Sequence, residues 1–192
     1  MVGIVVATLF VGACNGSEEP LGPAATLPQP TTTTDPYAVP AVIDEAYVNR
    51  VLAGLDHAVG DVTRSVVSER AVSADSVDRL KALYTGEFLR LSVASYEADM
   101  RNGFSGYRES PGDKTTVVTR LIDVSPKCIF AEVARNYSEV SKSPQSTSTE
   151  WVAIEPSDVQ SEPDANPTGW VFVYDGFDPG RTEPTNPCVG TP

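Results

Sequence analysis

The sequence predicts an α+β domain in which N-terminal helices pack on a curved antiparallel sheet of about four strands. Apolar residues recur at helical spacing through much of residues 41–102. From residue 114 onward, the pattern changes to short segments rich in β-branched and aromatic residues. Turn-forming residues separate these segments, so we expect the helices first and the strands after them.

Three helices are expected before the sheet. The first spans about residues 41–59, with Asp44 and Glu45 in its first turn, where the helix dipole favours acidic side chains. Its apolar spacing continues at Val62 and Val66. The second helix follows about residue 73, and the third begins after Thr85, which can cap it, and stops near residue 102.

Four strands are expected after the helices, at residues 114–124, 128–140, 148–156 and 169–177. The Ser125-Pro126-Lys127 break fits a turn between the first two strands. A polar loop separates the last two. Helices followed by an antiparallel sheet give the α+β layout.

Length and composition limit the classes of protein to which this chain can belong. Its 192 residues allow one modest domain with tails, and 41% hydrophobic residues suffice for one core. The net charge is -12, whereas nucleic-acid-binding proteins need basic stripes that neutralise phosphates. We therefore expect no nucleic-acid partner, and no purely electrostatic docking on anionic lipid.

Residues 1–13 form an uncharged apolar run that is too short to span a bilayer as a helix. The run has the length of a signal-peptide core and ends in Val11-Gly12-Ala13-Cys14, which resembles the lipobox of bacterial lipoproteins. In that family the signal is cut before the cysteine, whose thiol receives a diacylglyceryl group. The resemblance implies a lipid anchor at Cys14 on the extracytoplasmic face of the cell membrane. The alternatives are an ordinary secretory signal and a buried N-terminal strand. The basic residues that usually accompany such a run are absent, because the first basic residue of this sequence is Arg50.

Residues 14–40 are expected to form an extended tether. They contain six prolines and a run of four threonines, without apolar periodicity. Such a segment does not bury enough apolar surface to offset the entropy lost on ordering, and its prolines favour extended backbone. It would hold the domain clear of a membrane. The alternative is a disordered terminus without a tethering role.

Helices followed by a strongly curved antiparallel sheet resemble the NTF2-like cone fold. The segments that carry the resemblance are LYTGEFLRLSVASYEADMRNGF and VVTRLIDVSPKCIFAEVARNY, which are similar to actinobacterial lipoproteins and secreted proteins of this fold. The resemblance covers residues 41–180. It implies a pocket between the helices and the sheet, in which some family members carry out isomerase or dehydratase chemistry while others only bind or assemble. The fold therefore implies a concavity without a particular reaction.

Cys128 and Cys188 remain once Cys14 is assigned to the anchor. In an extracytoplasmic compartment such a pair favours a disulfide, which would attach the C-terminal tail, residues 181–192, to the sheet. The alternative is two free thiols in a cytoplasmic protein. The disulfide and the anchor both assume that the chain is exported.

No catalytic residue, metal site or cofactor is predicted. His57 is the sole histidine, and it is expected on the helix side away from the apolar stripe. The base of a Ser-His-Asp or Cys-His arrangement is therefore missing from the pocket. One histidine and two paired cysteines also leave no adequate set of zinc ligands.

The candidate pocket-lining residues are Tyr47, Tyr96, Asp123, Trp151 and Trp170. For isomerase-type chemistry a buried carboxylate is needed, and the candidates are Asp99, Asp123 and Glu132. Strict alternation places Asp123 on one strand face with Val117, Thr119 and Leu121, so its carboxylate could point into the cone. The alternative for Asp123 is a position on the rim. The aromatic residues could equally be ordinary core residues.

Three functions remain compatible with these patterns. The first is a non-catalytic cell-envelope lipoprotein whose domain binds a protein partner or a small apolar ligand outside the membrane. The second is a pocket enzyme of the isomerase or dehydratase type. The third is a surface spacer or shielding protein that blocks access to another envelope component. The patterns do not indicate an oligomeric state.

Overall fold

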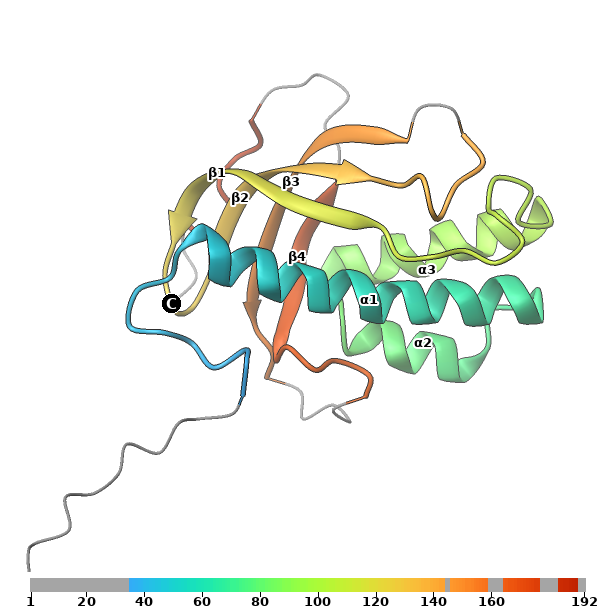
Figure 1. Ribbon diagram of the computed structural model, residues 1–192. Helices are drawn as coiled ribbons and strands as arrows, with labels where there is room; N and C mark the ends of the chain where they lie inside the picture. Colours follow the sequence, from blue (N-terminus) through green and yellow to red (C-terminus); the bar gives the residue numbers. More distant parts are fainter. Residues whose placement is uncertain (1–34, 144–145, 159–163, 177–182, 190–192) are drawn as a thin grey trace, which may run out of the picture. The chain divides into compact units, whose positions relative to one another are not determined.

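The structure is a computed structural model that describes residues 35–143, 146–158, 164–176 and 183–189. Three helices are followed by four strands (Figure 1). The helices are α1 (Glu45–Glu69), α2 (Ala74–Lys81) and α3 (Gly86–Arg101). The strands are β1 (Thr115–Val124), β2 (Ile129–Asn136), β3 (Thr147–Pro156) and β4 (Trp170–Gly176). The predicted α+β class is confirmed, whereas the expected signal run, Cys14 and most of the tether lie outside the described residues.

Helix α1 starts later and ends later than the sequence predicts. Asp44 is its N-cap, and the Asp44 carboxylate accepts a hydrogen bond of 2.8 Å from the backbone N–H of Tyr47. Val62 and Val66 are both fully buried, so the apolar face extends beyond Gly60. Burial of that face sustains the last helical turns.

Helix α3 begins at a contact with the sheet. Thr85 occupies the N-cap position, as expected, but its side chain makes no capping hydrogen bond. Its backbone N–H instead donates to the carbonyl of Phe172 in β4, at 3.1 Å. A tertiary contact therefore satisfies a backbone group at this end of the helix.

The sheet is an antiparallel meander in the order β1-β2-β3-β4. The register between β1 and β2 shifts twice, between Val118 and Arg120 and between Leu121 and Asp123. Such irregularities bend a strand and increase its twist. Figure 1 shows α1 crossing one face of the sheet. Helix α1 contacts β1 and β4, and α3 contacts β4, so the helices cover the inner face.

The main core fills the space between the helices and this inner face. Val51, Leu52 and Leu55 of α1 are fully buried and belong to the same cluster as residues from all four strands. The cluster includes Tyr47 and Trp170, whose indole N–H donates to the Tyr47 hydroxyl at 3.0 Å. A burial of this extent is the main favourable contribution to folding.

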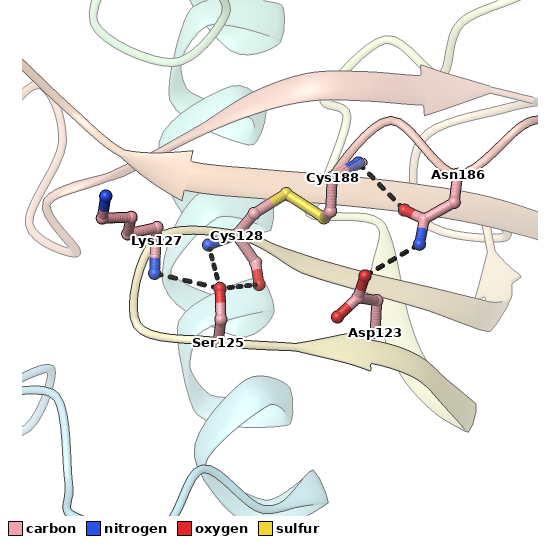
Figure 2. Close-up of a disulfide and its surroundings, with 6 residues drawn as sticks. All are labelled: Asp123, Ser125, Lys127, Cys128, Asn186 and Cys188. Carbon is pink, nitrogen blue, oxygen red and sulfur yellow. Dashed lines mark hydrogen bonds between the residues drawn. A yellow bond between two sulfur atoms is a disulfide. The ribbon is translucent and has the colours of Figure 1, made fainter. Parts of the chain in front are cut away.

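The outer face of the sheet carries a second, smaller cluster and the predicted disulfide. Cys128 is bonded to Cys188, with their Cα atoms 5.6 Å apart (Figure 2). Cys188 packs against the outer cluster of Phe130, Trp151 and Ala153. The disulfide thus holds the C-terminal segment across the outer face of the sheet, as the sequence predicts.

Candidate functional site

A cavity of about 400 Å³ lies between α1, α3 and the segments that follow α3 and β2. Its volume falls within the roughly 300–1,000 Å³ of typical small-molecule sites. Thr63 of α1 and Ser92 of α3 contribute polar groups to its walls, and Ser95 of α3 lines it while being exposed to solvent. The cavity therefore opens beside α3.

Four tyrosines dominate the lining: Tyr84, Tyr96, Tyr107 and Tyr137. Each hydroxyl has a hydrogen-bond partner at 2.7 to 3.1 Å, and the pairs are Tyr84 with Asp175, Tyr96 with Thr63, Tyr107 with Asp99 and Tyr137 with Glu150. These bonds hold the rings in place. Burial raises the pKa of all four hydroxyls, so the tyrosines stay neutral at physiological pH.

A cluster of buried charges lies behind the tyrosines, and its Lys114 reaches the cavity lining. The Lys114 ammonium lies 3.7 Å from a carboxylate oxygen of Asp56 and 3.7 Å from one of Asp175. Arg135 Nη1 lies 2.8 Å from Glu150 Oε2 and also pairs with Asp175. The five side chains are each at most 9% exposed. We call this set the floor cluster.

The pKa values of two aspartates of the floor cluster are shifted in opposite directions. Burial raises the pKa of Asp56, and the attraction of Lys114 and Arg135 offsets that effect only in part. Burial also acts to raise the pKa of Asp175, but Arg135 and Lys114 outweigh it and lower the pKa below its usual value. Asp175 is therefore the ionised partner of the two cations.

Strand alternation brings the charged residues of β2 and β3 to the inner face. Arg135 is in phase with Ala131 and Val133, which belong to the main core. Glu150 is in phase with Val152 in the same way. At one end of each of these two strands, the inward-facing residue is charged rather than apolar. These strand ends lie beside the cavity.

Lys114 is positioned by the segment that precedes β1. Asp113 accepts one hydrogen bond from Arg64, at 2.6 Å, and makes a 2.8 Å contact with His57 Nδ1, so it is linked to α1. A Cβ atom at Gly60 would lie only 2.0 Å from Asp113 Oδ1. Glycine at this position therefore lets the chain pass close to α1 and places Lys114 in the cavity wall.

Among the predicted pocket residues, Tyr96 lines the cavity. Tyr47 and Trp170 lie in the main core, where their edge-on rings have centroids 6.4 Å apart. Trp151 lies in the outer cluster, because it alternates with the inward-facing Glu150 and Val152. Tyr47, Trp151 and Trp170 are therefore packed within the two hydrophobic clusters and do not line the cavity.

Asp123 faces outward, which corrects the strict alternation assumed from the sequence. The register shift after Leu121 reverses the phase of β1, so Asp123 is paired with Phe130 of the outer cluster while Leu121 packs on the main core. The Asp123 carboxylate accepts a 2.8 Å hydrogen bond from the Asn186 side chain beside the disulfide (Figure 2). This bond links β1 to the C-terminal segment.

Of the candidate carboxylates, Asp99 lines the cavity, whereas Glu132 pairs with Arg120. The sequence patterns did not indicate the rest of the site: Tyr84, Tyr107, Lys114, Arg135, Tyr137 and Asp175. A signal for part of it exists, because Arg135 interrupts an otherwise apolar inner face at the end of a strand. Lys114 and Asp175 lie near strand ends, where the sequence pattern alone does not separate a solvated rim from a buried floor. Their proximity depends on strand pairing.

His57 lies outside the cavity, and its side chain is 62% exposed. Within the described ranges, no group of three or more histidine, cysteine, aspartate or glutamate side chains is arranged to hold a metal ion. The helices of those same ranges include none that is long and apolar enough to cross a membrane.

Comparison with known proteins does not assign the chain to a family. No protein-family model, curated protein or solved structure matches it. The arrangement of three helices before a four-stranded antiparallel sheet is compatible with the NTF2-like fold.

Proposed function

We propose that this chain is a non-catalytic cell-envelope lipoprotein whose NTF2-like domain binds a small molecule outside the membrane. The observation that carries the proposal is the cavity of about 400 Å³ walled by four tyrosines. Its mixed polar and aromatic lining favours a ligand with a polar group over the wholly apolar ligand suggested by the sequence. It also favours a small molecule over a protein partner.

The extracytoplasmic location is supported by two independent features. Disulfides persist in oxidising compartments, and Cys128 is bonded to Cys188. The apolar run that ends at Cys14 resembles a lipobox. Together they favour a domain that is exported and then retained at the membrane by a lipid.

A binding role is favoured because the ionisable groups of the floor are already paired. Asp56 and Asp175 face Lys114, and Glu150 faces Arg135. The histidine of the chain, His57, is exposed outside the cavity. A general base needs a carboxylate or imidazole within reach of the substrate proton, and neither the paired carboxylates of the floor cluster nor His57 meets that need.

The anchor is tested by mass spectrometry of the membrane fraction. We expect an N-terminal peptide that begins at Cys14 and carries a diacylglyceryl thioether. A mature protein in which Cys14 is present and unmodified would contradict the anchor, while leaving the cavity proposal intact.

Binding in the cavity is tested by filling it. In the full chain, Ser92→Trp places an indole in the cavity, whereas Ala94→Trp places the same group on the exposed side of the same helix. Fragments that raise the melting temperature of the wild type should act on Ala94→Trp and not on Ser92→Trp. Equal responses in both variants would show that the fragments bind elsewhere.

A pocket enzyme is the second candidate, and one contact favours it. Asp99 and Tyr107 both line the cavity, and the Tyr107 hydroxyl donates to the Asp99 carboxylate at 3.0 Å. A carboxylate beside a phenol can act as a base and a hydrogen-bond donor in proton transfer. Turnover of a bound ligand that Asp99→Asn abolishes, with ligand binding retained, would favour this candidate over the binding protein.

A further inference from the structure

The cavity and its floor carry more acidic than basic groups. Their charged residues are Lys114 and Arg135, against Asp56, Asp99, Glu150 and Asp175. Even with Asp56 neutral, three carboxylates face two cations. A ligand that enters this cavity therefore meets a net negative environment.

Both cations already have carboxylate partners, although Lys114 itself lines the cavity. Lys114 lies between Asp56 and Asp175, and Arg135 is held by Glu150 and Asp175. An anionic ligand at Lys114 would lie beside Asp56 and Asp175 and would have to compete with their carboxylates. Leaving a buried carboxylate unpaired is strongly unfavourable, which argues against an anion.

Asp99 differs from the carboxylates of the floor. It lines the cavity itself, and its side chain accepts a hydrogen bond from Tyr107. An ionised carboxylate has about four lone-pair sites. Asp99 can therefore face a second, positively charged partner without giving up Tyr107.

The tyrosine rings favour the same kind of partner. The face of an aromatic ring is electronegative and attracts cations that approach within about 6 Å of its centroid. The interior of this domain already contains two such contacts, because Lys114 Nζ lies 5.4 Å and Arg135 Cζ 5.9 Å from the ring centroid of Phe172. Four neutral tyrosines around a cavity extend this environment to a ligand.

We propose that the ligand of this cavity is a small organic cation, whose charged group lies among the tyrosine rings with Asp99 as its counter-ion. This inference rests on the proposed function, since it names the chemical class of the molecule that the cavity would bind. A neutral polyol, which could also stack on tyrosine rings, is the competing class.

The test compares choline with its neutral carbon analogue, in which a quaternary carbon replaces the nitrogen. Both are titrated into the full chain, in nonionic detergent, by isothermal calorimetry, and glycerol serves as the polyol probe. Choline should bind about tenfold more tightly than the analogue, because only the cation gains from the rings and from Asp99.

Two matched pairs of variants locate the binding. Asp99→Asn should weaken choline binding about tenfold, whereas Glu97→Gln, on the exposed side of the same helix, should leave it unchanged. Tyr107→Leu should weaken binding by about three- to tenfold, and Tyr107→Phe, which keeps the ring, should cost less. Far-UV circular dichroism checks that each variant is folded.

The outcomes separate this inference from the proposed function. Equal affinities for choline and its analogue, or tighter binding of glycerol, would overturn the inference that the ligand is a cation. The proposed binding cavity would still stand if that binding depended on Ser92. Choline binding that survives Asp99→Asn, Tyr107→Leu and Ser92→Trp indicates the acidic surface, and likewise overturns the inference. If none of the three probes and no fragment binds in a Ser92-dependent manner, both the cation and the binding cavity are ruled out.

Discussion

Arg135 is the side chain on which the floor cluster depends most. It is 3% exposed, and it joins Glu150 and Asp175, which come from different strands. Its Nε also donates to Thr116 of β1 at 3.3 Å. One guanidinium on β2 therefore links the inner face across the whole sheet.

Replacing Arg135 with methionine should be strongly destabilising. Methionine fills much of the volume but leaves Glu150 and Asp175 buried without their main partner, at a cost of about 3–5 kcal/mol. Urea denaturation measures the loss. Arg120→Met is the control, because Arg120 pairs with Glu132 and Glu183 at the surface and its removal should change stability little. Similar losses in both variants would contradict a special role for the floor.

Asp56 and Asp175 should give opposite pH dependences. The pKa of Asp56 is raised by folding, so its contribution to stability falls as the pH rises from the unfolded value through the folded one. The pKa of Asp175 is lowered, so its contribution is present above the unfolded value and is lost as the pH falls through the folded one. The stability of Asp56→Asn relative to the wild type should therefore rise from about pH 3 to pH 7, whereas the relative stability of Asp175→Asn should fall. Denaturation of both variants at the two pH values checks the signs, and a shared sign would contradict the assignment.

At the scale of elements, the helix starts depend on different contacts. Asp44 caps α1 through its side chain, whereas Thr85 at the start of α3 makes no side-chain cap. Asp44→Ala should cost about 1 kcal/mol of unfolding free energy, and Thr85→Ala should cost clearly less. Chemical denaturation of the two variants provides the comparison. A loss at Thr85 as large as that at Asp44 would show that its hydroxyl matters in a way that the cap geometry does not explain.

The C-terminal segment depends on the disulfide for its place on the sheet. Cys128 and Cys188 are separated by 60 positions, for which the chain-entropy model gives about 4 kcal/mol of stabilisation. The double variant Cys128→Ser/Cys188→Ser should lose stability of that order, and reducing agent should lower the wild type to the same level. The variant itself should not respond to reductant. A wild type that is insensitive to complete reduction would contradict a stabilising role.

At the scale of the whole molecule, the helices and the sheet share one core. The main core includes residues from every element, among them Leu55 (α1), Leu80 (α2), Tyr96 (α3), Val118 (β1), Val133 (β2), Ile154 (β3) and Phe172 (β4). Because every element contributes to this one cluster, the domain should unfold in one step. Far-UV circular dichroism and tryptophan fluorescence should give coincident urea transitions. Separate midpoints would indicate that the helices and the sheet unfold independently.

The sequence was most informative where the pattern is local. Helical spacing around Leu52 and Leu55 predicts α1, and β-branched residues predict the strands, because each pattern is contained in consecutive residues. The Cys128–Cys188 pair was predicted by counting cysteines and by expecting an exported chain, and the structure confirms the disulfide. Asp123 was misplaced, since strict alternation does not foresee the register shift that turns it outward.

By itself, the sequence determined the α+β class and the order of helices and strands, and it favoured the pairing of the last two cysteines. Only the tertiary structure decided that Lys114, Arg135, Glu150 and Asp175 meet beside a cavity, and that four tyrosines surround it. The physical reason is how far apart in the sequence the interacting residues lie. Periodicity acts between neighbours along the chain, whereas a buried charge cluster exists only when strand pairing and helix packing bring distant residues together and exclude water from them.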